Sequence, residues 1–283
     1  KGLASGLITG GMGGAAIIAA PIANALIERY GVSQAFWRMG LAYALVGFFF
    51  SLFIRSAPKQ IVPQTAATSE KAPTKAITAN KNWKEMLATP AFYLLILMFA
   101  MGAFSGLMIA SNASLIGQSM FGLSASAAAA YVSLYSLSNT SGRVFWGAVS
   151  DRIGQIRAVI IIYSAIIFAF VLLVSVNQVW AFAVGIVTLG LCFGGVMGVF
   201  PGLVMDNFGP ANQGVNYGIV FIGFSSAAFV APKVTASLAT ANNGDFTKAF
   251  YVAIAVVLIG LGLSLVYAKR KADAVEAAVE TIQ

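Results

Sequence analysis

Eight apolar segments, each long enough to cross a bilayer, dominate this sequence. A helix needs about 20 apolar residues to cross the hydrocarbon core, and only helices or closed barrels satisfy their backbone hydrogen bonds in lipid. Of the residues, 59% are hydrophobic and 9% are charged, whereas a soluble domain has about 25% charged residues. The sequence therefore predicts an all-α integral membrane protein. The expected spans are 3–26, 36–55, 91–113, 126–147, 157–176, 179–204, 213–239 and 248–268.

The basic residues are distributed unequally over the loops between these segments. When successive loops are placed on alternate sides, twelve of the seventeen Lys and Arg residues fall on one side, three on the other and two inside spans. In membrane proteins the cytoplasmic loops carry the excess of Lys and Arg. We therefore expect both chain ends in the cytoplasm. The net charge of +8 reflects this orientation and not binding to nucleic acid.

The stretch 56–82 differs in composition from the rest of the chain. It is rich in Ala, Thr, Pro and Lys and contains no aromatic residue, which is typical of a flexible linker. Two spans precede it and six follow it, a layout that fits eight of the twelve helices of a transporter built from two six-helix halves. We expect a fragment lacking about four N-terminal helices. Its predicted parts are the last two helices of the N-terminal half-bundle at 1–55, a cytoplasmic central linker at 56–90, a six-helix C-terminal half-bundle at 91–271 and a cytoplasmic tail at 272–283.

One cation, Arg143, lies inside a predicted span, just before a G-x-x-x-D-R-x-G turn at 147–154. Burying a guanidinium in a bilayer costs roughly 3 kcal/mol on insertion scales, and no acidic residue lies within the predicted spans. We therefore expect a transported anion as its partner, because a guanidinium can bind a carboxylate through two parallel hydrogen bonds. Two alternatives remain. The side chain could extend to the interface, or it could pair with an acid outside this chain.

Two neighbours of Arg143 are further candidates for the substrate site. Asn139 lies one helical turn before Arg143 on the same face, where it could orient the guanidinium, bind the substrate or join two helices. Tyr135 precedes it near that face and is a candidate cavity residue. The sequence contains no His and a single Cys, so it predicts no metal site, and it has no phosphate-binding loop. We expect no cofactor.

Three stretches resemble the major facilitator superfamily. G-A-V-S-D-R-I-G-Q-I-R at 147–157 is similar to its loop signature, and K-G-L-A-S-G-L-I-T-G-G-M-G-G-A-A at 1–16 resembles its glycine-rich fifth helix. F-P-G-L-V-M-D-N-F-G-P-A-N-Q-G-V-N-Y-G at 200–218 resembles the connection between helices ten and eleven in the oxalate/formate antiporter family, which is related to the monocarboxylate transporters. The resemblance implies alternating-access transport of small organic anions such as formate, oxalate or lactate across the plasma (inner) membrane, by a functional monomer.

The resemblance also implies roles for single residues in the substrate site. In that family an arginine of helix eight and a lysine of helix eleven bind a dicarboxylate. The arginine matches Arg143, whereas the position of the lysine falls at about Phe224. Tyr217 belongs to the family-like motif and is expected near the substrate. With one cation in place of two, the site fits a single carboxylate better than a dicarboxylate.

A second group of residues is expected to form a gate. In the superfamily the acid of the loop signature meets the N-terminus of a neighbouring helix, which here would be residues 2–6. An anion is favoured there by the helix dipole. We therefore expect Asp151, with Arg152 and Gly147, to hold the cytoplasmic side shut.

The sequence is compatible with more than one mode of transport. Proton coupling usually uses an acidic residue within the membrane, and the predicted spans have none. Anion exchange needs no such residue and is favoured, with a proton-coupled monocarboxylate symporter as the alternative. An enzyme or a channel is a weaker hypothesis, because the sequence shows no catalytic motif and no repeated filter-like loop.

Overall fold

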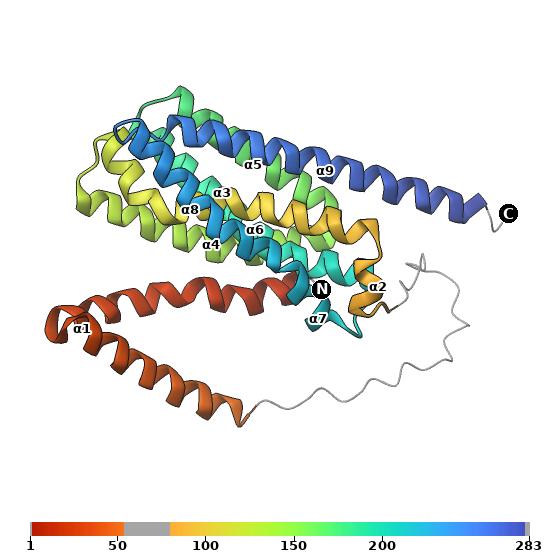
Figure 1. The fold of residues 1–283 in the computed structure, drawn as a ribbon, viewed down its shortest axis with the longest axis horizontal. Coiled ribbons are helices and arrows are strands. Elements are labelled where there is room, and N and C mark those ends of the chain that lie inside the picture. Colours follow the sequence, from red (N-terminus) through yellow and green to blue (C-terminus); the bar gives the residue numbers. More distant parts are fainter. Residues whose placement is uncertain (1, 54–79, 281–283) are drawn as a thin grey trace. The chain divides into compact units, whose positions relative to one another are not determined.

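The computed structural model describes residues 2–53 and 80–280, and within these ranges all regular structure is helical. Figure 1 shows the helices with their labels. Residues 54–79, which include most of the linker predicted at 56–90, lie outside the described residues, as do the last three residues of the predicted tail. The helices are α1 (Gly2–Ser51), α2 (Trp83–Leu87), α3 (Pro90–Phe121), α4 (Ala125–Ile153), α5 (Gln155–Ser175), α6 (Val179–Phe208), α7 (Gln213–Val220), α8 (Ile222–Ala241) and α9 (Thr247–Glu280).

Five helical segments of the described chain are long and apolar enough to cross a membrane: α3, α5, α6, α7 together with α8, and α9 up to Asp273. Each of them overlaps a predicted span. The predicted span at 126–147 is also helical, as α4, but it carries Asn139, Arg143 and several Ser and Thr residues, which lower its hydropathy. The fold class expected from the sequence, an all-α membrane protein, is confirmed.

The chain divides into two units, residues 1–15 with 78–283 and residues 16–77. In the second unit, α1 is interrupted at Gly31, whose φ of 76° and ψ of 165° are not helical. Such a backbone conformation is readily adopted only by glycine. The two helical arms that meet there correspond to the first two predicted spans.

α6 is the central helix of the larger unit, and it packs against α3, α4 and α5. Nineteen of its thirty residues are buried. Along its contact with α4, glycines recur every fourth residue at 190, 194 and 198. A Cβ atom at Gly194 would lie too close to the carbonyl oxygen of Asn139, and one at Gly198 would lie 2.6 Å from that of Arg143. The two helices therefore meet backbone to backbone, as small residues allow in lipid.

The outer surface of the larger unit carries large apolar side chains. Phe168 on α5, Phe229 on α8 and Tyr251 on α9 are all more than half exposed. Water solvates exposed side chains of this kind poorly, whereas a bilayer solvates them well. This surface agrees with an integral membrane protein.

Candidate functional site

Arg143 lies on α4 with only 5% of its surface exposed. Its Nη1 donates a hydrogen bond of 2.8 Å to the backbone oxygen of Thr9 on α1. Its Nε is buried and has no hydrogen-bond partner. No carboxylate among the described residues forms an ion pair with it, whereas the phenol groups of Tyr135 and Tyr217 are close enough to interact with it electrostatically. The guanidinium thus keeps an unused donor in a buried setting.

Asn139 is placed one turn before Arg143, as predicted, and its backbone lies against Gly194 of α6. Its Oδ1 is buried without a hydrogen-bond partner. The structure shows no hydrogen bond that joins this side chain to another described helix, which was the alternative to a ligand role. A buried polar atom without a partner costs about 1–3 kcal/mol. As an acceptor, this oxygen could take an N–H or O–H donor but not a carboxylate oxygen.

Tyr135 is 3% exposed, and its hydroxyl donates a hydrogen bond of 2.7 Å to the carbonyl oxygen of Gly106 on α3. Its ring stacks with Phe193 of α6 at a centroid distance of 6.4 Å. Since the only donor of the side chain already serves α3, Tyr135 holds α3, α4 and α6 together at the site. Its position near Arg143 agrees with the prediction, while its contacts are those of a packing residue.

An aromatic cluster from four helices lies at the two predicted positions on α7 and α8, Tyr217 and Phe224. Phe221 and Phe224 have ring centroids 4.7 Å apart, and Phe224 stacks with Phe193 at 6.4 Å. Phe99 of α3 is the centre, with four ring neighbours at 4.6–6.2 Å. The members of the aromatic cluster are Phe99, Phe193, Phe200, Tyr217, Phe221 and Phe224.

The sequence predicted only Tyr217 and Phe224 of this cluster as site residues, and it did not indicate Phe99, Phe193, Phe200 or Phe221. A signal was present on α7 and α8, because Tyr217, Phe221 and Phe224 follow the i, i+4, i+7 spacing of one helix face. Nothing in the sequence indicated that Phe99, about 120 positions earlier, would lie against them. The cluster reaches the Arg143 face of α4 through the stacked pair of Phe193 and Tyr135.

The predicted gate residues lie at the far end of α4. The carboxylate of Asp151 accepts a hydrogen bond of 3.0 Å from the backbone N–H of Leu3 in the first turn of α1, which is the contact expected for this acid. Gly147 is buried, and its carbonyl accepts the hydroxyl of Ser150 at 2.8 Å. Arg152 is exposed, and no contact to another described residue is found for it. The structure therefore brings Asp151, but not Arg152, against α1.

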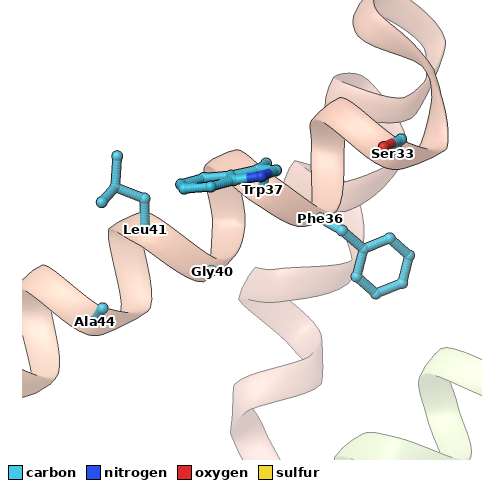
Figure 2. A pocket seen from close by; sticks show the side chains of 6 residues that line it. All are labelled: Ser33, Phe36, Trp37, Gly40, Leu41 and Ala44. Carbon is cyan, nitrogen blue, oxygen red and sulfur yellow. The ribbon is translucent and has the colours of Figure 1, made fainter.

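Arg143 lines neither of two hollows on the described surface. The first, about 580 Å³, lies in the smaller unit along one helical arm of α1 and carries no titratable side chain (Figure 2). The second, about 530 Å³, lies between α3, α8 and the turn before α9. Its lining residues are Asn112, Leu115, Gln118, Ser119, Ala236, Ala239, Thr240, Gly244 and Phe246. Both lack a charge that could select an anion.

The spanning helices, the buried cation and the glycine seam define an integral, multi-pass membrane protein with an interior polar site. The family model described as Major Facilitator Superfamily matches residues 1–232, and this chain belongs to that family. Its named relatives are transporters and not enzymes.

Two curated proteins are similar over most of the chain. The "Uncharacterized MFS-type transporter YhjX" of Escherichia coli K12 is 33% identical over 226 residues, which cover 79% of this chain and 54% of that protein. The "Oxalate:formate antiporter" of Oxalobacter formigenes is 27% identical over 266 residues, which cover 93% of this chain and 61% of that protein. The chain thus spans between half and two thirds of the length of these relatives.

A solved structure supports the fold. The crystal structure of a peptide transporter POT in complex with sulfate superimposes with a TM-score of 0.58 and 20% identity, covering 74% of this chain and 47% of that one. At 20% identity the match supports the helical architecture alone.

Proposed function

We propose that this chain is part of a secondary transporter that exchanges small organic anions by alternating access, with Arg143 as the carboxylate ligand. The observation that carries the proposal is the state of the Arg143 side chain: it is 5% exposed, its Nε has no partner, and no described carboxylate neutralises it. A buried cation in a membrane protein marks a substrate or ion pathway. A carboxylate would supply both the missing charge and the missing acceptor.

The aromatic cluster favours a substrate with one carboxylate, such as formate, lactate or a similar monocarboxylate. Phe224 stands where the resemblance places a second cation, and its ring packs among Phe193, Phe221 and Phe99. A second carboxylate placed against the aromatic cluster would lose its hydration without gaining an ionic partner, which costs several kcal/mol. An apolar substituent on a monocarboxylate would be solvated by the rings.

Two contacts between α4 and α1 supply the conformational step of this proposal. Asp151 accepts from the N–H of Leu3, and Arg143 donates to the carbonyl of Thr9. A carboxylate that reaches Arg143 competes with the Thr9 carbonyl for the guanidinium, and the charged acceptor forms the stronger hydrogen bond. Substrate binding would therefore weaken the hold of α4 on α1 and shift the population toward the state in which the two helices separate.

The orientation of the protein in the membrane and its oligomeric state are also part of the proposed function. The excess of basic residues on one side supports an orientation with both chain ends in the cytoplasm, and the plasma (inner) membrane is the location proposed from the family resemblance. The linker at 56–90 would join the helices of 1–55 to a six-helix half-bundle at 91–271, followed by a tail at 272–283. We propose that the transporter works as a monomer, because the residues assigned to substrate binding all come from one chain.

The experiment that tests the function is uptake of labelled formate, oxalate, lactate and pyruvate into proteoliposomes that contain the intact transporter. We expect uptake of a monocarboxylate that is strongly stimulated when the liposomes are loaded with an unlabelled counter-anion. Uptake that follows an imposed pH gradient and ignores the internal anion would replace exchange by proton symport. No uptake of any carboxylate would refute the proposed function.

A further inference from the structure

The turn between α6 and α7 binds the chain segment that leads into α2. The carbonyl oxygen of Lys81 accepts two hydrogen bonds from side-chain amides, 3.1 Å from Asn212 Nδ2 and 3.0 Å from Asn216 Nδ2. The backbone N–H of Lys81 donates to the carbonyl of Phe208 at 2.9 Å. The peptide groups of Lys81 are thereby paired on both sides with residues about 130 positions later in the chain.

The neighbouring residue extends this contact. Asn80 Oδ1 accepts the backbone N–H of Ala211 at 3.1 Å, and Asn80 lies directly against Gly209, where a Cβ atom would stand 2.9 Å from the Cα of Asn80. Gly209 also has a φ of 79°, which favours glycine. We name the set of Asn80, Lys81, Asn212, Asn216 and the turn at 208–211 the clasp.

Downstream of Lys81 the chain is also held in one conformation. Asn82 caps α2 by accepting the backbone N–H groups of Lys84 and Glu85, at 2.9 and 3.0 Å. Glu85 returns a hydrogen bond by accepting the N–H of Asn82 at 2.7 Å. This reciprocal capping box gives the clasp a rigid continuation into α2 and α3.

α7 is held partly by such polar contacts and partly by the ring of Tyr217, which lies 6.2 Å from that of Phe99 and 5.7 Å from that of Phe221. Of its eight residues only Asn216 and Val220 are buried, and its N-terminus has no side-chain cap. Gln213 Nε2 ties it to α6 through the carbonyl of Pro201 at 2.7 Å. Its remaining polar anchors are the amides of Asn212 and Asn216 that hold Lys81.

The asparagines that bind Lys81 and the residues assigned to the substrate site lie on neighbouring faces of α7. Asn212 and Asn216 are one turn apart, while Gln213, Tyr217 and Phe221 follow one position later at the same spacing. Because Tyr217 directly follows Asn216, a rotation of α7 that releases Asn216 from Lys81 also moves the rings of Tyr217 and Phe221. The clasp thus couples the position of Lys81 to the aromatic cluster.

We propose that Asn212 and Asn216 are positioning residues of the transporter: through the clasp they set the orientation of α7, and so the position of Tyr217 near Arg143 and of Phe221 in the aromatic cluster. This assigns a physical role to most of the F-G-P-A-N-Q-G-V-N stretch, namely reception of the Asn80–Lys81 segment. The effect on substrate affinity rests on the proposed function, whereas the existence of the clasp does not.

The first test is limited proteolysis with trypsin in detergent, which reports the clasp itself. Trypsin cleaves after Lys81 only when it can take the segment into its active site in an extended form, and the clasp occupies both peptide groups of Lys81. Asn212→Ala, Asn216→Ala and Asn80→Ala should each accelerate cleavage after Lys81 by about fivefold or more. Cleavage within the exposed Lys269–Lys271 run of α9 is the internal standard.

The second test separates positioning from simple destabilisation. In proteoliposomes the Asn216→Ala and Asn212→Ala variants should raise the KM for the transported monocarboxylate several-fold, with a much smaller change in the maximal rate. Asn177→Ala, at an exposed position in the α5–α6 turn without a hydrogen bond to a described residue, is the matched control and should change neither quantity. Asn80→Ala removes an exposed side chain, so it covers the case in which Asn216→Ala fails to fold.

Three results distinguish the outcomes. Unchanged cleavage after Lys81 in all three variants would overturn the clasp. Faster cleavage with an unchanged KM would overturn the positioning role. If the unmodified transporter takes up no carboxylate, the proposed function fails, while the proteolysis result still decides whether the clasp exists.

Discussion

The guanidinium of Arg143 holds the backbone of α1 through a 2.8 Å hydrogen bond from Nη1 to the carbonyl oxygen of Thr9. The cation proposed to bind substrate is thus also a contact between α1 and α4, the two helices that separate in the proposed transport cycle. A backbone carbonyl is a neutral acceptor and therefore a weaker partner for a guanidinium than a carboxylate. The arrangement allows the substrate to replace an interhelical contact when it binds.

Arg143 is the first residue to change. Arg143→Gln removes the charge and should abolish uptake of the monocarboxylate, while Arg143→Lys keeps the charge but loses the planar fork and should leave weak uptake with reduced affinity. Labelled uptake in proteoliposomes measures both. Arg152→Gln, at an exposed residue of the same helix, is the control and should retain most activity. Normal uptake by Arg143→Gln would contradict the assignment.

Asp151 should affect conformational balance more than substrate affinity. Asp151→Ala removes the acceptor of the Leu3 N–H, and Asp151→Asn weakens it by removing the charge. Because the contact holds one state, both changes should favour separation of α1 and α4 and slow the cycle without raising the KM. The measurement is uptake at several substrate concentrations, together with the rate at which a maleimide labels a cysteine placed at Val144. Wild-type turnover with unaltered labelling would argue against a gate.

The residue at position 224 should determine whether the transporter prefers a substrate with one carboxylate or one with two. Phe224→Lys places a second cation in the aromatic cluster, and oxalate should then compete better for uptake of the labelled monocarboxylate. Phe224→Leu removes the ring without adding charge and serves as the control, with no gain for oxalate. If oxalate is already the best competitor of the unmodified transporter, the argument from a single cation fails.

The seam between α4 and α6 should tolerate no added side chain. Gly194→Ala would force a methyl group into the carbonyl of Asn139, and overpacking of this kind costs about 1–3 kcal/mol. We expect a lower melting temperature in detergent. Gly218→Ala, where no atom lies within 4 Å of the new carbon, should leave it unchanged or raise it slightly. Equal melting temperatures of the two variants would show that the helices can move apart at this point.

The thermal stability of the protein should depend on pH through Asp245. Its Oδ1 accepts the hydroxyl of Thr247 at 2.6 Å and the backbone N–H of Thr247 at 2.8 Å, and these bonds lower the pKa of the carboxyl below its ordinary value. A carboxyl with a lowered folded-state pKa stabilises the fold above the unfolded pKa of about 3.9 and loses that effect as the pH falls through the folded value. The melting-temperature difference between the wild type and Asp245→Ala should therefore be constant at neutral pH and shrink below about pH 4. A difference that does not shrink at all as the pH falls below about 4 would contradict it.

The sequence alone determined the elements that depend on local rules. Hydropathy and length located the helices that became α3, α5, α6, α7 with α8, and α9, because a bilayer imposes the same length and polarity on any spanning segment. The loop signature also predicted the contact between Asp151 and the start of α1. The isolated cation at Arg143 was visible for the same reason, since a charge stands out in an apolar segment.

Only the tertiary structure decided which groups meet that cation and the rings around it. The acceptor of Arg143 is a backbone carbonyl at Thr9, and the acceptor of Asn212 and Asn216 is another at Lys81. Every residue has a carbonyl, so no residue type or spacing marks these two in advance. Likewise, Phe99 joins the aromatic cluster because α3 packs against α6, α7 and α8. These partners are determined by interhelical packing. In lipid, such packing follows from close backbone approach and not from hydrophobic patterning.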